Sequence, residues 1–325
     1  MVKVEHLVKR FGQNYAVNDI SFEIGNGEIV GLLGPNGAGK STTMNIITGY
    51  LSSTSGSAKI NGVDILENPI EAKSMIGFLP EQPPLYGDMT VDEYLNFVFD
   101  LKACSFDRDA HISEIVNVVK LADVRGRLIR NLSKGYKQRV GIAQALIGDP
   151  KLIVFDEPTV GLDPKQILEV RNLIRTLSKN HTVILSTHIL AEVQAVCERV
   201  IIINQGKIIA DEKTSELTKA IEEGYHYEVK ICGPTKDVAQ ALGRIRGIKA
   251  VTSTGERDAD SYAYVIESDR GIDPRKPIFN LCAEHSWAIL GMAPMGTDLE
   301  SIFIRLVDRD NGIEAKPKQK QLRAH

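Results

Sequence analysis

The strongest constraint on the fold of this chain is the segment GPNGAGKST at residues 34–42, which has the spacing GxxxxGK[ST]. It stands between an apolar run at 29–33 and a helical pattern at 40–48, and a phosphate-binding P-loop requires this order of strand, loop and helix. Glycines allow the backbone N–H groups to turn inward around phosphate oxygens, and the helix adds the positive end of its dipole. The segment therefore predicts nucleotide binding.

Two side chains of this loop carry specific chemistry. Lys40 supplies a mobile positive charge to the phosphates, and Ser41 offers a hydroxyl to Mg²⁺. Such a motif arises by chance in a chain of this length with a probability of roughly one in a hundred, since glycine makes up about 7% of residues. An accidental Gly-rich turn is excluded only by further matching segments. The residues expected to bind the nucleotide here are Gly34, Pro35, Asn36, Gly37, Ala38, Gly39, Lys40, Ser41 and Thr42.

Composition narrows the class of protein. The 325 residues include 39 Lys and Arg against 42 Asp and Glu, so no overall positive field favours nucleic acid as the main partner. Apolar runs such as 152–155 and 200–203 are far shorter than the ~20 residues of a membrane-spanning helix, and residues 1–12 lack the apolar core of a secretory signal. The four cysteines are too widely spaced for a disulfide framework or a metal site. We therefore expect a cytosolic protein with reduced thiols.

The pattern from residue 1 to about 222 predicts an α/β domain. Short β-branched runs alternate there with helical patterns, as in a mainly parallel sheet covered on both faces. Polar segments follow most of these runs directly, and ligands gather at the carboxyl ends of parallel strands. Residues 91–132 read as helical and form an inserted lobe, taken as about 88–145. The expected strands are 29–33, 152–155, 182–186 and 200–203.

A second domain is expected at 223–310. Residues 225–231 alternate apolar and polar side chains, as a half-buried strand does, and the later patterns follow the order βαββαβ. A closing helix begins at Thr297 with a capping box to Glu300. The polar, basic stretch at 311–325 is expected to be a disordered, solvated tail, with contact to anionic lipid as the minority alternative.

Two adjacent carboxylates follow the apolar run at 152–155. An acidic pair at such a place is usually a helix cap, but with a P-loop upstream Asp156 can hold Mg²⁺ and Glu157 can act as base for an attacking water. His188, just past another predicted strand, can reach a γ-phosphate from its position. We therefore predict Lys40, Glu157 and His188 as catalytic residues and Ser41 and Asp156 as metal ligands.

With these three segments in order, residues 1–220 resemble the ATP-binding subunit of an ABC transporter. The resemblance implies a P-loop NTPase core with a mainly parallel sheet, an antiparallel β edge and an inserted helical lobe, followed by the small α+β domain. It also implies that Phe11, in KRFG, occupies the position of the aromatic residue that stacks on adenine. The implied cofactors are ATP and Mg²⁺.

Two further segments extend the resemblance. LSKGYKQR at 132–139 is similar to the family's signature loop, which implies that Ser133 and Gly135 bind the γ-phosphate held by the opposite subunit. GLD at 161–163 looks like the D-loop, whose Asp163 would touch the partner's P-loop.

This sequence departs from the family pattern at two places. The signature has Lys134 for the commoner glycine and Tyr136 for the commoner glutamine, which puts the details of the partner-phosphate contacts in doubt. FLPEQPPLY at 78–86 corresponds to the Q-loop, which joins the core to the helical lobe and, through it, to a membrane partner. Direct alignment puts Glu81 at the glutamine position, with Gln82 one place later, so either side chain is a candidate for the contact with metal and water.

The resemblance implies an assembly of several chains. A second copy of this chain, or a similar ATPase subunit, would meet it head to tail around two ATP molecules, and hydrolysis would drive a separate transmembrane permease. The sequence looks most like subunits of ABC-2-type exporters, with importer subunits still open, and such a subunit would lie on the cytoplasmic face of the cell membrane. No nucleic-acid partner is expected.

Two other classes of protein share part of this pattern. A soluble ABC ATPase acting in translation, repair or assembly has the same nucleotide motifs. A P-loop kinase or GTPase of another family has residues that act like Lys40, Ser41 and Asp156, but it lacks the signature loop and the histidine.

Overall fold

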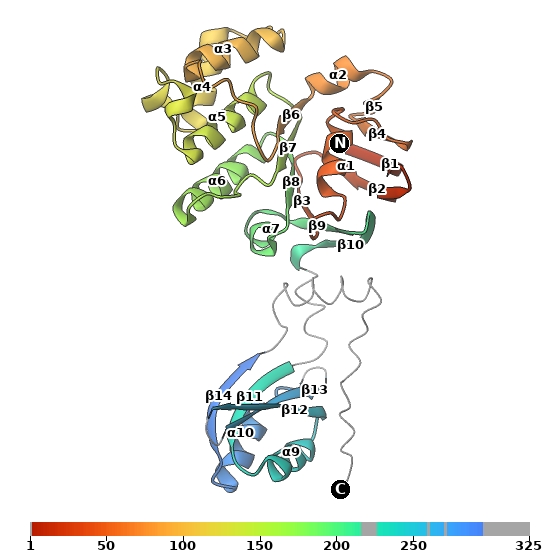
Figure 1. Ribbon diagram of the computed structural model, residues 1–325, viewed down its shortest axis with the longest axis vertical. Helices are drawn as coiled ribbons and strands as arrows, with labels where there is room; N and C mark the ends of the chain where they lie inside the picture. The colour runs from red at the N-terminus through yellow and green to blue at the C-terminus, as the bar shows by residue number, and fades with distance from the viewer. Residues whose placement is uncertain (1, 216–225, 259–260, 270–271, 295–325) are drawn as a thin grey trace. The chain divides into compact units, whose positions relative to one another are not determined.

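The computed structural model describes residues 2–215, 226–258, 261–269 and 272–294 (Figure 1). The chain divides into two compact units, Met1–Thr214 and Ser215–His325, and each is described by itself. The expected domain boundary near residue 222, the closing helix from Thr297 and the tail at 311–325 lie outside the described residues.

A six-stranded sheet forms the centre of the first unit, in the order β10-β9-β3-β8-β7-β6. The five strands from β9 to β6 run parallel, and β10 is antiparallel to β9. Every residue of β3, β7 and β8 is buried, as expected for a parallel sheet covered on both faces. This sheet confirms the predicted α/β class, and the four predicted strands all form. The strands are β3 (Ile29–Leu33), β6 (Ile76–Leu79), β7 (Leu152–Asp156), β8 (Thr182–Thr187), β9 (Arg199–Asn204) and β10 (Lys207–Lys213).

The antiparallel edge is a separate four-stranded sheet in the order β2-β1-β4-β5. Its strands are β1 (Val2–Phe11), β2 (Asn14–Ile24), β4 (Ser55–Ile60) and β5 (Val63–Asp64). Their apolar side chains share one core with the central sheet and with α1 (Lys40–Ile47), whose Met44 and Ile47 are fully buried. The helix that follows the P-loop is therefore held between two sheets (Figure 1).

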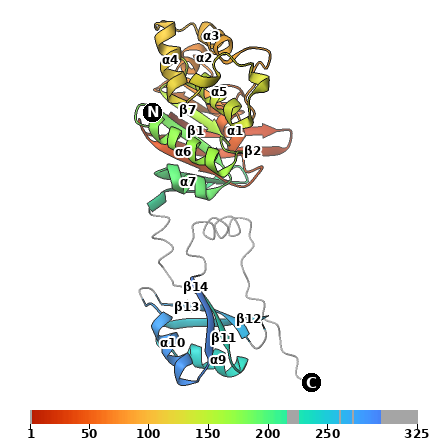
Figure 2. The ribbon, with the colours of Figure 1, turned by 90° about the vertical axis from the view of Figure 1, so that its left-hand side faces the viewer.

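The inserted helical lobe lies between β6 and β7 in the sequence, as predicted. It contains α3 (Val91–Leu101), α4 (Arg108–Val118), two short 3₁₀ turns and α5 (Lys134–Leu146), which pack on one another (Figure 2). The helix α3 begins at a capping box, in which Thr90 and Glu93 bond each other's backbone N–H groups. The helix α5 leads the chain from the lobe back to β7.

The remaining helices of the first unit join its strands. A short helix, α2 (Pro69–Ser74), precedes β6. The helices α6 (Pro164–Leu177) and α7 (Leu190–Val196) follow β7 and β8, so each begins near the carboxyl end of a central strand. Polar segments after those two strands are therefore brought to the same edge of the sheet as the P-loop.

In the described part of the second unit, the elements follow the predicted order βαββαβ. The four strands described there form one antiparallel sheet in the order β12-β13-β11-β14. Side chains of the two helices described there, among them Val238 and Ile278, share a core with Val229 and Ile266 of the sheet. The elements are β11 (His226–Cys232), α9 (Thr235–Gly243), β12 (Ile248–Asp258), β13 (Ser261–Ser268), α10 (Arg275–Glu284) and β14 (Ala288–Pro294).

Candidate nucleotide-binding site

The P-loop turns between β3 and α1 against two neighbouring segments of backbone. A Cβ atom at Gly34 would lie 2.2 Å from the carbonyl oxygen of Ile203, and one at Gly39 would lie 2.4 Å from that of Ala16. Gly39 also has a φ of 111°, a conformation that L side chains rarely adopt. Close packing and backbone conformation therefore account for the glycines at these two positions of the motif.

Lys40 is almost fully buried at the first position of α1. Its Nζ donates to the carbonyl oxygens of Gly34 at 2.7 Å and Pro35 at 3.1 Å, which holds the ammonium group inside the loop. Burial lowers the pKa of Lys40, and the negative charges of Glu157 and Asp156 oppose that shift. The lysine therefore brings a desolvated positive charge into the P-loop.

Ser41 and Asp156 come together at the edge of the sheet, as the sequence predicts. The Ser41 hydroxyl donates to Oδ1 of Asp156 at 3.4 Å. A hydroxyl and a carboxylate are the kinds of oxygen ligand that Mg²⁺ prefers, so Ser41 and Asp156 would hold the ion. No cluster of three or more His, Cys, Asp or Glu side chains suited to a metal occurs within the described ranges. A pair of oxygen ligands suits an ion that is otherwise held by substrate phosphates and water.

Glu157 occupies a strained backbone position directly after β7. Its φ is 49°, in the left-handed region, and its N–H donates to the carbonyl oxygen of Ser186 at 3.0 Å. One carboxylate oxygen, Oε1, lies 2.9 Å from Nδ1 of His188. The other, Oε2, is buried and has no hydrogen-bond partner among the residues that the structure describes. A buried carboxylate oxygen in this condition is suited to receive a hydrogen bond from a water molecule.

A cavity of 510 Å³ lies beside Lys40, Ser41, Glu157 and His188, whereas Asp156 lines a neighbouring cavity of 660 Å³. Glu81 lines the 510 Å³ cavity, and both Glu81 and Gln82 line the neighbouring cavities of 660 and 480 Å³. Phe11 is 53% exposed at the end of β1 and is not part of the lining. The predicted residues that line the cavity are Asn36, Gly37, Gly39, Lys40, Ser41, Thr42, Glu81, Glu157 and His188.

The residues predicted from the signature loop and the D-loop lie outside this cavity. Ser133 is the N-cap of α5, where its Oγ accepts from the N–H of Tyr136 at 3.4 Å, and Asp163 is the N-cap of α6. Gly135 packs so closely against Gln166 of α6 that a Cβ would lie 2.6 Å from the side-chain amide carbon. The starts of α5 and α6 are therefore in contact, away from the P-loop of the same chain.

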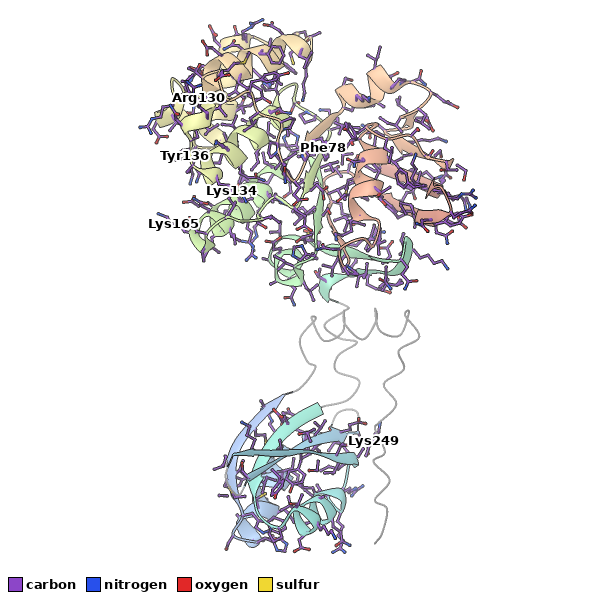
Figure 3. All side chains as sticks on the ribbon, in the orientation of Figure 1. Phe78, Arg130, Lys134, Tyr136, Lys165 and Lys249 are labelled. Carbon is purple, nitrogen blue, oxygen red and sulfur yellow. The ribbon has the colours of Figure 1, made fainter. Side chains whose placement is uncertain are left out.

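Lys134, which departs from the family pattern in the signature loop, is labelled in Figure 3. Its side chain lies against Gly161, the glycine of the D-loop segment. Its Nζ stands 2.0 Å from the point that a Cβ on Gly161 would occupy. Gly161 has a φ of 70°, so backbone conformation and contact both favour glycine there. Sequence reasoning noted each residue separately but missed their contact, because only folding brings the two loops together.

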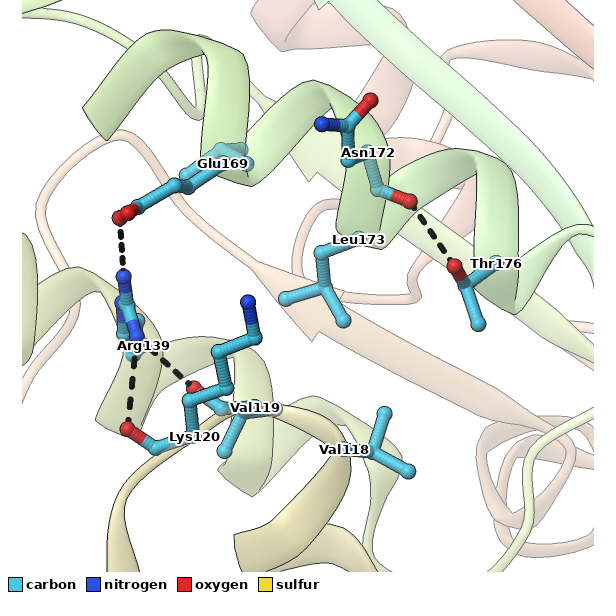
Figure 4. A pocket seen from close by; sticks show the side chains of 9 residues that line it. Val118, Val119, Lys120, Arg139, Glu169, Asn172, Leu173 and Thr176 are labelled. Atoms are coloured by element: carbon cyan, nitrogen blue, oxygen red, sulfur yellow. Dashed lines mark hydrogen bonds and ion pairs between the residues drawn. The ribbon is translucent and has the colours of Figure 1, made fainter. Parts of the chain in front are cut away.

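Arg139 connects α5, the helix that begins at the signature loop and is called the signature helix below, to α4 and α6 (Figure 4). Its guanidinium donates to the carbonyl oxygens of Val119 and Lys120, just after α4, and pairs with Glu169 of α6. One helical residue earlier, the Gln138 amide donates to the carbonyl oxygen of Pro158 at 2.8 Å. The signature helix is thus bonded directly to the segment that follows Glu157, and these contacts too were missed from the sequence.

Two other sequence expectations can be compared with the structure. No helix in the described part of the chain is both long and apolar enough to cross a membrane. All four cysteines are free thiols, and two of them, Cys197 and Cys282, are buried.

Comparisons with known proteins agree with the geometry. A family model described as ABC transporter matches residues 17–160. The linearmycin resistance ATP-binding protein of Bacillus subtilis is 30% identical over 319 residues, which cover 95% of this chain and 99% of that protein. The lantibiotic transport ATP-binding protein of Streptococcus pyogenes is 36% identical over 230 residues, covering 70% of this chain and 97% of that protein.

A solved structure gives the same result for the fold. It is a dimeric ATP-binding cassette in a post-hydrolysis state, bound to ADP and Pi, with a TM-score of 0.60 and 29% identity. The similarity covers 66% of this chain and 98% of the other. The P-loop, the acidic pair after β7 and the histidine after β8 therefore sit in a known type of nucleotide-binding fold, and the chain belongs to the ABC transporter family as one of its ATP-binding proteins.

Proposed function

We propose that this chain hydrolyses Mg-ATP in a pair of ATPase subunits and thereby drives a separate membrane permease, which exports its cargo. The observation that carries the proposal is the arrangement of Glu157 in the cavity that Lys40 also lines. One of its oxygens is buried without a hydrogen-bond partner in the described part of the chain, and the other lies 2.9 Å from Nδ1 of His188. A base, a positive charge and a P-loop in one cavity are the groups that phosphoryl transfer to water requires.

Each residue has a distinct part in this reaction. Lys40 neutralises charge on the phosphates, while Ser41 and Asp156 would hold Mg²⁺, which when bound stabilises negative charge on the phosphate oxygens. Glu157 accepts a proton from the attacking water through Oε2, the oxygen that no described residue bonds. His188 holds the other oxygen of Glu157 and stands where it can contact the γ-phosphate.

A second subunit completes the site in this proposal. Ser133, Gly135 and Asp163 lie at the starts of α5 and α6 and do not line the cavity of their own chain. A head-to-tail pair would place them against the nucleotide of the partner, and the dimeric cassette with ADP and Pi supports such an arrangement for this family. The partner is a second copy or a similar ATPase subunit.

The membrane partner is inferred from the relatives. Two of them are described as a lantibiotic transport protein and a linearmycin resistance protein, which supports an exporter bound at the inner face of the cell membrane. A cavity of 660 Å³, lined by Phe78 and Gln82 of the Q-loop and by Tyr50, offers a docking site for the permease. Tyr50 is 81% exposed, as expected for a side chain that a partner covers.

The proposal also gives a role to the second unit. The match to the linearmycin resistance protein spans 95% of the chain and therefore includes most of the second unit. We assign to residues 223–310 an accessory role in stabilising or regulating the dimer.

Complementation tests the shared site. Lys40→Ala removes the P-loop charge, and Ser133→Asp keeps an N-cap oxygen for α5 but repels a phosphate. Each variant alone should be inactive, whereas a mixture should regain ATPase activity, because one of the two sites in a mixed dimer has both Lys40 and Ser133. If Ser133→Asp alone turns over ATP as fast as wild type, the shared site is wrong.

Recovery from gently solubilised membranes tests the permease. Tagged wild-type chain should carry a polytopic membrane protein with it, and Tyr50→Glu should lose that companion while still hydrolysing ATP. The control is Leu168→Glu on α6, which adds the same charge at another exposed apolar residue outside the cavity. Equal recovery with Tyr50→Glu and Leu168→Glu would contradict docking at Tyr50.

A further inference from the structure

Glu192 is a buried carboxylate that does not line the nucleotide cavity. It is bonded to the two catalytic segments, which are the one that follows Glu157 and the one that contains His188. It lies in the first turn of α7 with 2% of its surface exposed. Oε1 accepts a hydrogen bond from the Thr159 hydroxyl, and Oε2 accepts one from the Thr187 hydroxyl at 2.9 Å. Both threonines are buried as well. In the ranges that the structure describes, no lysine or arginine forms an ion pair with Glu192.

A carboxylate in this environment is unfavourable for stability alone. A buried charge loses its hydration, and two hydroxyl donors replace only part of it. An apolar side chain of similar size would pack between α7 and β8 without that loss. A structural role, in which Glu192 merely attaches α7 to the sheet, therefore leaves the charge unexplained.

The two threonines stand at informative places in the chain. Thr159 comes two residues after Glu157, and Thr187 directly precedes His188. The Thr187 hydroxyl also accepts a hydrogen bond from the N–H of Ile189 at 3.1 Å. The residues on either side of His188 are therefore bonded to each other. One carboxylate is therefore hydrogen-bonded to each of the two segments that carry the catalytic pair.

We propose that Glu192 is a positioning residue that holds the Glu157 segment and the His188 segment at the separation needed for proton transfer from water. Its negative charge shortens and strengthens both hydroxyl bonds, which are then better able to hold Glu157 in its left-handed conformation. The inference rests on the proposed function, in which Glu157 is the base.

Threonine-to-valine changes test this proposal while leaving the Glu192 side chain in place. Thr159→Val and Thr187→Val each remove one bond to Glu192 and keep the shape of the residue. We expect kcat for ATP hydrolysis to fall by about 10- to 100-fold, the range that a small misplacement of catalytic groups produces. The dissociation constant of ATP should change less than about twofold. Thr159→Ser and Thr187→Ser, which keep the hydroxyl, should have the kcat of wild type.

The control is Thr48→Val at the C-cap of α1. Thr48 is also buried, and its hydroxyl donates to the carbonyl oxygens of Met44 at 2.9 Å and Asn45 at 3.3 Å, both within α1. Its kcat should match that of wild type. The proposal is wrong if the Thr159 and Thr187 variants keep wild-type kcat, if their ATP affinity falls in parallel with kcat, or if serine fails to restore kcat.

A readout that needs no turnover separates this inference from the proposed function. In nucleotide-free protein labelled with ¹⁵N-histidine, the ring signals of His188 should shift in both valine variants and return in the serine variants. An inactive wild-type chain whose His188 signals still respond would refute the ATPase and retain the positioning role. An active wild-type chain whose His188 signals and kcat ignore both valine changes would refute the positioning role and retain the ATPase.

Discussion

Nδ1 of His188 lies 2.9 Å from Oε1 of Glu157, at the meeting point of two segments that are 31 residues apart in the sequence. The pair is partly exposed on the histidine side and nearly buried on the glutamate side, with 43% and 10% of the two side chains accessible. Both side chains line the nucleotide cavity, and the glutamate is much less accessible to bulk water than the histidine. Such an arrangement suits a base that accepts a proton only from a water held in the site.

Glu157→Gln should bind ATP and hydrolyse it slowly. The amide keeps the shape of the side chain but cannot accept a proton from water, and a positioned base typically contributes about 10²- to 10⁴-fold in rate. The variant should therefore accumulate ATP-bound dimers. Light scattering should show a larger mass with Mg-ATP than without it. As a control, Glu212→Gln on the exposed strand β10 should behave as wild type. Wild-type turnover by Glu157→Gln would exclude it as the base.

Lys40→Ala should lose tight binding of Mg-ATP. Charge-assisted hydrogen bonds are worth about 1.5–3 kcal/mol each, and at 1.4 kcal/mol per tenfold the loss of one weakens binding by about 10- to 100-fold. Titration calorimetry measures the affinity. Lys59→Ala is the control, because Lys59 lies on β4 outside the nucleotide cavity and forms an ion pair with Glu5 of β1 at 3.7 Å. Unchanged affinity in Lys40→Ala would mean that the nucleotide binds elsewhere.

Gly161→Ala should slow ATP hydrolysis, and its loss of folding stability should be no larger than that of a matched glycine variant. Gly27 is a close match, since it has a φ of 72° against 70° for Gly161 and no neighbouring atom within 4 Å of an added Cβ. Both alanine variants should lose about 1–2 kcal/mol of unfolding free energy, the strain of a left-handed residue. Only Gly161→Ala displaces the end of Lys134, which can move at little cost in stability.

Urea denaturation and ATPase assays separate the two effects of these glycine changes. Gly161→Ala should hydrolyse ATP more slowly than Gly27→Ala, and Lys134→Ala should show the same defect with no further loss in the double variant. Equal ATPase rates in the two glycine variants would show that the contact between Lys134 and Gly161 has no part in turnover.

Alkaline pH should destabilise the first unit through Cys197. Burial, with a smaller contribution from the charge of Glu192, raises the pKa of Cys197 to about 12 from its ordinary value of 9.0. The unfolded chain therefore loses the thiol proton first, and stability falls as pH rises from 9 towards 12, by up to about 1.4 kcal/mol per pH unit from this group. Below pH 9 the thiol is protonated in both states and contributes no slope.

The measurement is the free energy of unfolding in urea between pH 8 and 11. Cys197→Ala should show a smaller slope than wild type above pH 9. As a control, Cys232→Ala on β11 should keep the wild-type slope for the first unit. Identical slopes in wild type and Cys197→Ala would mean that the thiol ionises without unfolding.

Local patterns in the sequence identified the P-loop, the inserted helical lobe and four strands of the central sheet, β3, β7, β8 and β9. The apolar runs that became β3, β7 and β8 are buried on both faces and could be recognised without knowledge of their neighbours. The spacing from Gly34 to Ser41 is a property of one strand, one loop and one helix. The βαββαβ order of the second unit was likewise predicted, from the alternation of apolar and polar residues in its strands and from the helical spacing of apolar residues.

Contacts between distant segments were decided only by the tertiary structure. The lysine at 134 lies on the glycine at 161, Arg139 reaches Glu169, and Glu192 bonds two threonines beside the catalytic pair. Resemblance to a family suggested functions for some of these segments, but not that they touch one another within one chain. The physical reason is that periodicity records which face of an element is buried, whereas the packing of complete elements selects the side chains that meet across the sheet edge.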